Sequence, residues 1–211
     1  MRFWETEVPF VALGYSKCWR KEVFEEVCAA EEIPVLRRCS GGGTVLQARG
    51  CLNYALVLPI DSRAELESIS STNEFIMGEQ ASALRKAFGL DLRVQGCSDL
   101  TLGGRKFCGN SQRRKRRYLL FHGSFLVSAD LQLIGRSLRL PEQQPDYRGH
   151  RTHGDFLVNL GLPSTKVQEA LIEHWRPDRR EPDDADRAVI MQIVDSLEAE
   201  KYGREEWNLK F

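Results

Sequence analysis

The chain has 211 residues, with 30 basic and 30 acidic side chains and therefore no formal net charge at pH 7. This length suits one medium-sized domain, and a hydrophobic share of 42% with 28% charged residues is typical of a globular fold. These values exclude a disordered tail, a collagen-like rod, a coiled coil and a solenoid. No run approaches the roughly 18 apolar residues of a membrane-spanning helix, and the first residues carry no apolar signal core. We therefore expect neither a membrane partner nor export.

The cysteines indicate a reducing compartment. They include no Cys-x-x-Cys pair, so the usual zinc signature is missing and we expect no metal site. An even number of cysteines predicts a disulfide framework mainly in short secreted chains. We therefore expect reduced thiols in a cytoplasmic protein. The six are Cys18, Cys28, Cys39, Cys51, Cys97 and Cys108.

Short β-like runs dominate the first sixty residues, at 8–13, 33–37, 44–47 and 52–58. Between the first two of these runs, residues 21–30 predict a short helix. At Ser62 a capping box is expected, because Glu65 stands three residues later and can reach back to the N-cap amide. Apolar residues then recur at helical spacing, which predicts a helix from about 63 to 88 that ends at Gly89.

The middle of the chain predicts a hairpin, in which strands 98–102 and 105–108 flank the two-residue turn Gly103-Gly104. Residues 118–127 are apolar enough for a central strand, and the polar residues 141–152 predict a loop. Two helices are expected around 167–171 and 190–197, joined by a charged linker at 176–187. Strands with helices interspersed on one side favour an α+β fold.

The strongest local signal is Arg37-Arg38-Cys39-Ser40-Gly41-Gly42-Gly43-Thr44, directly after a predicted strand. Three successive glycines permit backbone angles that other residues avoid, and backbone N–H groups in such a loop can converge on an anionic oxygen. The two arginines add bidentate donors for phosphate or carboxylate. The alternative is a tight turn between two strands. Because the spacing fits neither a P-loop nor a dinucleotide fingerprint, we expect an anion site of another kind.

Lys106 and His122 are the next candidates. Lys106 stands on the returning strand of the hairpin, where its ammonium can act on a phosphate or a developing oxyanion, although most strand lysines are simply solvated. His122 lies inside an apolar strand, where a satisfied structural histidine is commoner than a catalytic base. Gly123 beside it indicates close approach of backbone or ligand. Ser40 and His122 do not predict a serine hydrolase, because no GxSxG elbow is present.

Residues 105–117 contain seven basic side chains and no acidic one. Binding of a nucleic acid would need a broader basic surface, and aromatic residues for single strands. Only Tyr118 adjoins this run, so we expect no nucleic-acid partner. A solvated segment that steers an acidic protein or ATP toward the site fits better.

Several motifs together resemble the signature of the lipoate–protein ligase A family, whose superfamily includes biotin–protein ligases and octanoyltransferases. The first is the glycine-rich run 37–45, followed by Gly50-Cys51-Leu52-Asn53-Tyr54. The resemblance covers nearly the whole chain, and motifs in the same order are more specific than any one alone. The later matching segments are Asp99-Leu100-Thr101, Gly104-Arg105-Lys106, Gly109-Asn110-Ser111-Gln112, His122-Gly123-Ser124-Phe125-Leu126, Tyr147-Arg148, Asn159-Leu160, Lys201-Tyr202 and Glu206-Trp207-Asn208.

This resemblance implies an α+β fold with a mixed, largely antiparallel sheet flanked by helices, and a two-step reaction. Mg-ATP first activates lipoate or octanoate to an acyl-adenylate. The acyl group then passes to a lysine of an acidic lipoyl domain or of a glycine-cleavage H protein. Lys106 matches the catalytic lysine of the family, which would hold the acyl carbonyl and α-phosphate oxygens. The substrate and ATP pocket would be formed by Arg37, Arg38, Ser40, Gly41, Gly42, Gly43, Thr44, Asn53, Gly109, His122 and Gly123.

The sequence departs from the family pattern at three points. Members usually carry a strand and a helix before the position of Met1, and the larger ligases add a C-terminal accessory domain. We therefore expect a single catalytic domain over 1–211, with either a separate accessory subunit or a transfer-only activity. Cys39 and Cys108 stand where other small residues are expected, and basic neighbours would lower the pKa of such a thiol.

These departures leave two alternatives open. One is an octanoyl or lipoyl transferase that uses a cysteine thioester and no ATP. The other is a catalytically silent acyl-binding protein, although the presence of Lys106 argues against it. Lipoyl and octanoyl substrates are not distinguished, because one methylene is worth only ~1–3 kcal/mol of discrimination.

Overall fold

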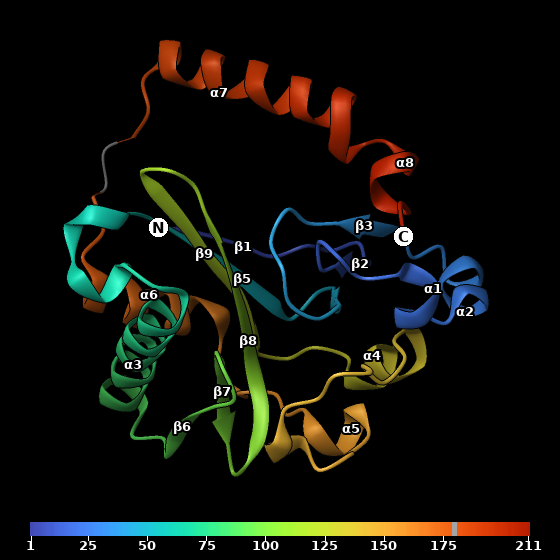
Figure 1. The fold of residues 1–211 in the computed structure, drawn as a ribbon. Coiled ribbons are helices and arrows are strands. Elements are labelled where there is room, and N and C mark those ends of the chain that lie inside the picture. The colour runs from blue at the N-terminus through green and yellow to red at the C-terminus, as the bar shows by residue number, and fades with distance from the viewer. Residues whose placement is uncertain (179–180) are drawn as a thin grey trace.

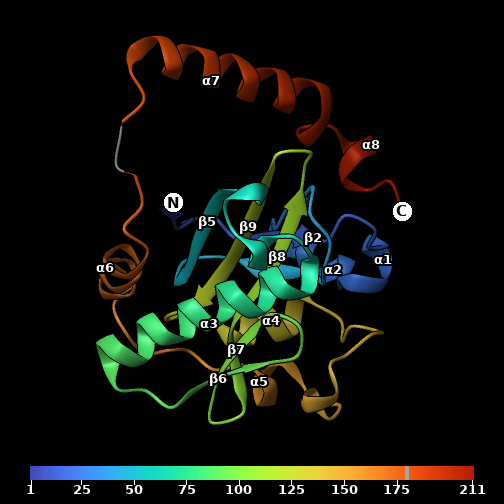
Figure 2. The same cartoon turned by 60° about the vertical axis from the view of Figure 1, so that its left-hand side comes forward.

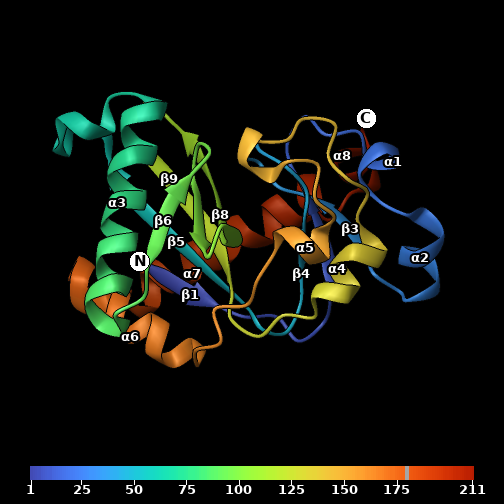
Figure 3. The ribbon, with the colours of Figure 1, turned by 90° about the horizontal axis from the view of Figure 1, so that it is seen from below.

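The computed structural model describes residues 1–178 and 181–211, and its strands form two sheets that lie side by side (Figures 1 and 3). The larger sheet is antiparallel throughout, with strand order β1–β5–β9–β8–β7–β6. Its strands are β1 (Arg2–Trp4), β5 (Cys51–Pro59), β9 (Tyr118–Leu126), β8 (Arg105–Arg114), β7 (Asp99–Leu102) and β6 (Leu92–Gln95).

The smaller sheet has the order β3–β2–β4. Its central strand β2 (Phe10–Leu13) pairs in parallel with β3 (Val35–Arg37) and antiparallel with β4 (Val45–Gln47). The predicted α+β class with a mixed, largely antiparallel arrangement is therefore confirmed, with the strands divided between two sheets.

Two helices, α3 (Ile69–Phe88) and α6 (Ser164–Trp175), pack together against the larger sheet (Figure 2). The core between these helices and the sheet is mostly apolar, and each buried apolar side chain contributes ~1.5–3 kcal/mol by leaving water. Members that are completely buried include Leu52, Tyr54, Ile76, Met77, Leu84, Phe107, Phe121, Phe125, Val167 and Leu171.

A second core forms beneath the smaller sheet, where Val11, Leu13 and Leu46 meet Ile134 and Leu138. The helices around it are short and come from distant parts of the chain. They are α1 (Trp19–Glu22), α2 (Glu25–Ala30), α4 (Leu131–Ser137) and α5 (His153–Phe156), with the 3-10 turn η3 (Asp146–Arg148) leading into α5.

The start of α3 differs from the prediction. Ser62 does not cap it: Arg63 is extended, with φ −155° and ψ 143°, and the chain instead makes two 3-10 turns, η1 (Ile60–Ser62) and η2 (Ala64–Leu66). The capping box is formed six residues later, where the hydroxyl of Ser68 accepts the Ser71 amide and the Ser71 hydroxyl accepts the Ser68 amide. The predicted end is confirmed, since Gly89 adopts a left-handed φ of 65°.

The helix predicted over 21–30 is two short helices, α1 and α2. Val23 between them is extended, with φ −123° and ψ 157°, and forms a bridge with Leu138. Burial of Val23 in the second core outweighs the local helical preference of the segment.

The basic run is not a single solvated strip, because β8 continues to Arg114 rather than ending at Cys108. The Arg113 guanidinium donates to the carbonyl of Cys39, and Arg114 donates to the carbonyls of Leu66 at 2.6 Å and Glu67 at 3.0 Å. Residues 115–117, at the tip of the β8–β9 hairpin, are exposed. Within the run, this tip and Arg105 match the expected solvated segment.

The C-terminal part crosses the molecule and returns to it (Figures 1 and 2). Helix α7 (Asp184–Leu197) lies apart from the body, and all its apolar side chains from Val189 to Leu197 are exposed. It continues through the π-helical turn η4 (Glu198–Tyr202) to α8 (Glu205–Asn208). Residues 179 and 180 of the predicted linker lie outside the described residues. No helix in the described ranges is long and apolar enough to cross a membrane.

The returning segment, which contains α8, is hydrogen-bonded to β3. The side-chain oxygen of Asn208 accepts the Arg37 amide at 2.8 Å, and the Trp207 indole donates to the Arg37 carbonyl at 2.9 Å. The Arg37 guanidinium in turn donates to the carbonyls of Gly14 and Lys17 at 3.0 and 2.7 Å. The last residue of β3 is therefore fixed from both sides, immediately before the glycine-rich segment begins.

Candidate active site

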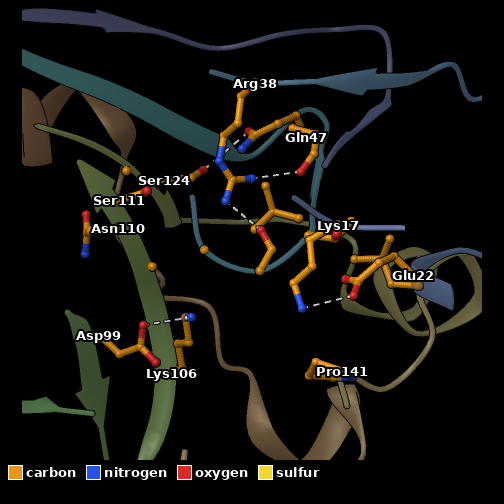
Figure 4. Close-up of a pocket in the computed structure, with 18 of the residues that line it drawn as sticks. Lys17, Glu22, Arg38, Gln47, Asp99, Lys106, Asn110, Ser111, Ser124 and Pro141 are labelled. Carbon is orange, nitrogen blue, oxygen red and sulfur yellow. Dashed lines mark hydrogen bonds and ion pairs between the residues drawn. The ribbon is translucent and has the colours of Figure 1, made fainter. Parts of the chain in front are cut away.

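A cleft of about 560 Å³ lies where the two sheets meet, and Figure 4 shows many of its side chains. Strands β8 and β9 form one wall, and β2, β4 and the glycine loop, residues 39–44, form the opposite wall. Trp4, at the end of β1, stands at its edge and is 40% exposed. The cleft therefore draws residues from elements that are far apart in the sequence.

The cleft is electropositive although the whole chain is neutral. Among the described residues, two acidic side chains line it, Glu22 and Asp99. Both are already paired: Glu22 lies 3.2 Å from Lys17, and Asp99 lies 2.8 Å from Lys106. Five cationic side chains share these walls, namely Lys17, Arg38, Lys106, Arg139 and Arg148. This excess of positive charge suits an anionic ligand.

Lys106 is placed by an irregularity in β8. Thr101 pairs with Lys106 while Leu100 pairs with Cys108, so Phe107 is the extra residue of a β-bulge, and its ring is fully buried in the core. The Lys106 carbonyl also accepts the amide of Val158 at 3.0 Å. The backbone beneath the lysine is therefore held from two sides.

Gly109 makes room for the Lys106 side chain. A Cβ atom at position 109 would lie 2.7 Å from both Cε and Nζ of Lys106, closer than real Cβ contacts. The lysine therefore lies along the strand over Gly109, and the ammonium reaches the wall of the cleft (Figure 4). Its side chain is 25% exposed, so it is open to a ligand without being fully solvated.

The carboxylate that pairs with Lys106 has a second partner. Asp99 accepts the Lys106 ammonium through Oδ1 at 2.8 Å and the Tyr147 hydroxyl through Oδ2 at 2.7 Å. Tyr147 belongs to η3, which the sequence placed in a loop. Burial and the neighbouring Asp99 carboxylate raise the pKa of Tyr147, so its hydroxyl stays protonated and donates.

The glycine loop is organised around Arg38. The guanidinium donates to the carbonyls of Ala12 at 2.9 Å and of Gly41 and Gly43 at 2.6 Å each. Burial lowers the pKa of Arg38 to about 10, so the group still carries its charge at pH 7. Gly42 has a left-handed φ of 86°, a conformation that favours glycine. Arg38 therefore shapes the loop from inside as well as lining the cleft.

His122 on β9 joins the loop to the larger sheet. Its Nε2 atom lies 2.6 Å from the Ser40 hydroxyl. Burial, and secondarily the Arg38 charge, lower the pKa of His122 to about 4. The imidazole is therefore neutral at pH 7. The Ser40 hydroxyl is the hydrogen-bond partner that a structural histidine on an apolar strand is expected to have.

The structure brings most of the predicted site residues together. Arg37 instead faces the C-terminal segment and lies outside the cleft wall, because its guanidinium is enclosed by backbone carbonyls. Ser40 and Gly41 belong to the glycine loop but do not line the cleft, and they contact His122 and Arg38, respectively. The predicted residues that line the cleft are Arg38, Gly42, Gly43, Thr44, Asn53, Lys106, Gly109, His122 and Gly123.

The lining residues that were not among the predicted ones include the charged or titratable side chains of Lys17, Glu22, Asp99, Arg139, Arg148 and His153. Lys17 and Glu22 follow β2, and their sequence carries no signal, since isolated charges near short helices are common. Arg148 is 4% exposed, and its Nη2 lies 3.4 Å from Nδ1 of His153. Arg148 stands in the matching segment Tyr147-Arg148, to which no site role was assigned, and His153 lies outside every matching segment.

A smaller cavity of about 100 Å³ adjoins the cleft. The two cavities share Lys106, Gly109 and Ser124 in their walls, so the lysine stands at their junction. The side chains that line the smaller cavity are mostly apolar and include Val45, Leu46, Leu126, Ile134, Leu138, Phe156 and Leu157, of which Val45, Leu138 and Phe156 also line the cleft. Apolar walls of this kind suit an apolar ligand group.

The two cysteines considered as nucleophiles have no thiol in the cleft. Cys108 is fully buried, its Sγ lies 3.5 Å from the side-chain oxygen of Asn110, and burial raises its pKa. The expected lowering of the Cys108 pKa by basic neighbours is therefore wrong, since desolvation dominates. Cys39 belongs to the glycine loop but is absent from the cleft wall, and its side chain contacts Tyr202.

Two sheets thus meet at a cleft in which a glycine loop faces a strand lysine, an arrangement that suits an anionic ligand. The sequence profile of the lipoyl protein ligase A/B catalytic domain matches residues 1–173, which is most of the chain. The protein belongs to this family, whose characterised members are enzymes, and the family resemblance predicted from the motifs is confirmed.

Similar proteins include both ligases and transferases. Lipoate–protein ligase 1 of Staphylococcus aureus is 22% identical over 92% of this chain, which spans only 54% of that protein. Octanoyltransferase LipM of Kyrpidia tusciae is 27% identical over the whole chain and 86% of its own length. Lipoate-protein ligase A subunit 1 of Thermoplasma acidophilum is 25% identical over 94% of this chain and 80% of its own.

Solved structures agree on the fold. A bipartite lipoate protein ligase from Thermoplasma acidophilum, studied with its E2 lipoyl domain, superposes with a TM-score of 0.79 at 24% identity, over 99% of this chain and 82% of that one. A lipoate-protein ligase A bound with ATP gives 0.77 at 25% identity, over 99% and 84%. The second sheet, α7 and α8 thus fall within the structural similarity as well.

Proposed function

We propose that the protein is an ATP-dependent lipoate–protein ligase. It would activate lipoate or octanoate with Mg-ATP and transfer the acyl group to a lysine of a lipoyl domain or glycine-cleavage H protein. The observation that carries this proposal is the position of Lys106 at the junction of an electropositive cleft and an apolar cavity. An acid with a hydrocarbon tail and a nucleotide would meet at this point.

The first step joins the acid to the nucleotide. With the tail in the apolar cavity, a carboxylate oxygen attacks the α-phosphorus of ATP, and pyrophosphate leaves with the electron pair of the broken P–O bond. The Lys106 ammonium stabilises the charge on the α-phosphate and carboxylate oxygens. Backbone amides of Gly42, Gly43 and Thr44 supply further donors, and Arg38 keeps their loop in shape.

The second step transfers the acyl group. The amine of the acceptor lysine attacks the acyl carbonyl, AMP leaves, and an amide forms. Lys106 then holds the carbonyl oxygen as charge develops on it. Asn53, Gly109, His122 and Gly123 form the wall on the side of the larger sheet. Because burial lowers the pKa of His122 to about 4, its imidazole is a weak base at pH 7, and we assign it a structural role beside Ser40 rather than proton transfer.

The comparisons support the substrates and partners of this proposal. One similar structure contains ATP, and a Thermoplasma acidophilum ligase with a TM-score of 0.78 contains lipoic acid. The bipartite ligase of that organism is a two-part enzyme with a lipoyl domain as partner. We propose the same kind of acidic acceptor here, and a separate accessory subunit. The exposed basic tip at 115–117 would steer the acceptor.

A thioester transferase remains the second candidate, because LipM octanoyltransferases match the whole chain. Among the described residues, however, no cysteine lines the main cleft. Cys108 is buried with a raised pKa, which disfavours the thiolate that the covalent route needs. All six cysteines are unpaired, which is compatible with the cytoplasmic location that we also propose.

Isotope exchange separates the two candidates. With lipoate and Mg-ATP, the ligase incorporates labelled pyrophosphate into ATP. Absence of exchange, together with octanoyl transfer from an acyl carrier protein, would favour the transferase. An acyl adduct lost in Cys39→Ser would locate its nucleophile.

Replacement of Lys106 tests the catalytic assignment. We expect Lys106→Ala to reduce transfer by a hundredfold or more, roughly the loss seen when one oxyanion donor is removed. Lys86→Ala, an exposed lysine of α3, is the matched control and should transfer at the normal rate. A normal rate in Lys106→Ala, with the variant folded by circular dichroism, would refute the role of Lys106.

A further inference from the structure

We infer that Asp99 and Tyr147 are positioning residues that hold the Lys106 ammonium at the junction of the two cavities. The chemical meaning of this inference rests on the proposed function, but the contacts exist in the free protein. Asp99 bridges Lys106 and Tyr147, using a different carboxylate oxygen for each, at 2.8 and 2.7 Å. The three groups therefore form one connected chain from η3 to the cleft.

Burial makes this chain more than a surface ion pair. The side chain of Asp99 is 15% exposed and that of Lys106 is 25% exposed. A carboxylate so far removed from water needs partners, and the structure provides one for each oxygen. Lysine has three ammonium N–H donors, so the bond to Asp99 leaves two for the oxygens of a substrate. Asp99 thus holds the Lys106 ammonium in place and leaves two of its N–H donors free to bind substrate.

Tyr147 reaches Asp99 from a separate element, and its ring is held by packing. The ring centroid lies 5.3 Å from that of Phe156, and the ring edge lies close to Gly96, where a Cβ would approach it to 3.3 Å. A phenylalanine at position 147 would make the same ring packing contacts. Within the described residues the hydroxyl donates to Asp99, and we assign it the role of orienting that carboxylate.

The opposite side of the cleft offers an internal comparison. Lys17 and Glu22 form a similar pair at 3.2 Å, with side-chain exposures of 23% and 7%. Within the described residues Glu22 has no tyrosine partner, and Lys17 pairs with Glu22 rather than with Asp99 (Figure 4). Changes at Asp99 or Tyr147 should therefore alter Lys106 and leave Lys17 unchanged.

The contacts can be tested in the free protein by competitive acetylation with trace acetic anhydride, followed by mass spectrometry of each lysine. We expect Asp99→Asn to increase the labelling rate of Lys106 about fivefold, because a partly buried pair is worth roughly 1 kcal/mol. Tyr147→Phe keeps the ring packing and should increase it about twofold. Tyr54→Phe, which removes another buried tyrosine hydrogen bond, should leave Lys106 labelling unchanged.

Catalysis supplies the second readout. If the inference holds, Asp99→Asn lowers kcat for pyrophosphate exchange about tenfold while KM for ATP stays within twofold, and Asp99→Glu recovers part of the loss. Unchanged Lys106 labelling in both Asp99→Asn and Tyr147→Phe would overturn it. So would an increased Mg²⁺ requirement without a labelling change, which would assign Asp99 to the metal–nucleotide complex. If the Asp99→Asn and Tyr147→Phe variants label faster at Lys106 but the wild type shows no pyrophosphate exchange, the positioning inference stands and the ligase proposal is rejected.

Discussion

His122 shows how its surroundings determine the charge of a cleft residue. Its ring is enclosed between the larger sheet and the glycine loop, with the Ser40 hydroxyl 2.6 Å away and the Arg38 guanidinium nearby. Desolvation and this neighbouring cation both disfavour the imidazolium, which lowers the pKa of His122 to about 4. A second positive charge is thereby kept out of the loop that we propose to bind phosphate.

The lowered pKa makes a prediction about acid stability. In the unfolded chain histidine titrates near 6.5, so below that pH the unfolded state binds a proton that the folded state does not. His122 should therefore lower the free energy of unfolding by ~2 kcal/mol between pH 7 and pH 5. The loss is complete only near the folded pKa of about 4.

Urea unfolding of the wild type and of His122→Gln at the two pH values measures this effect. Glutamine keeps a partner for Ser40 and cannot titrate, so the variant should lose ~2 kcal/mol less than the wild type on acidification. Equal losses in the two proteins would mean that the His122 pKa is near its ordinary value.

At the residue scale, the sequence could predict groups that belong to motifs but not their partners. Lys106 was found because it stands in an ordered set of motifs. Tyr147 was not assigned a role, because it lies 48 positions from Asp99 and only the fold brings them together. The direction of the Cys108 pKa shift was predicted wrongly because the sequence does not show that its thiol is completely buried. Its basic neighbours in sequence do not offset that burial.

Among the elements, the glycine loop depends on a contact that no motif reveals. Gly14, just after β2, approaches the loop so closely that a Cβ there would lie 2.0 Å from the carbonyl oxygen of Gly42. Since both atoms involved belong to backbone, the loop would have to move. Gly43, within the same loop, would meet nothing within 4 Å.

We therefore predict that two glycine-to-alanine substitutions affect the unfolding free energy differently. Gly14→Ala should displace the glycine loop, reduce pyrophosphate exchange at least tenfold and lower the unfolding free energy by ~1–3 kcal/mol, the usual cost of overpacking. Gly43→Ala should change the unfolding free energy by less than ~0.5 kcal/mol. Similar behaviour of the two variants would show that the Gly14 contact does not set the loop.

The elements most visible in the sequence were the long periodic ones. The body and end of α3 were predicted, whereas its start was not, because the Ser62–Glu65 pattern competes with an equally good cap at Ser68. The short strand β1 has only three residues and gains its structure from pairing with β5. Elements held by tertiary contacts rather than local preference could not be predicted from the sequence.

For the molecule as a whole, net charge was a poor guide to partners. The chain sums to zero, yet the cleft carries five cationic side chains against two acidic ones. Two of the arginines in the basic run, Arg113 and Arg114, are tied to backbone carbonyls of other segments. Location within the fold, and not the count along the chain, decides which charges meet a ligand.

Helix α7 gives a test of the overall architecture. Ile190 and Val194 are 49% and 44% exposed, and no residue of α7 is buried. Replacing both by serine should therefore change the unfolding free energy by less than ~0.5 kcal/mol per site. Ile76→Ala in the main core, where the side chain is fully buried, should cost ~2–5 kcal/mol.

Equilibrium unfolding in urea, with circular dichroism as the signal, measures both variants. A loss above 2 kcal/mol for the α7 double variant would show that this helix packs against the body in solution.

The position of Trp4 gives the molecule its own optical reporter. Of the four tryptophans, all within the described ranges, only Trp4 lines the cleft, where it is 40% exposed. A ligand that displaces water from this indole should shift its emission to shorter wavelength, while Trp19, Trp175 and Trp207 supply a constant background. Fluorescence titration of the unlabelled protein with lipoate or ATP would then follow occupancy of the cleft directly, and Trp4→Phe would remove the signal.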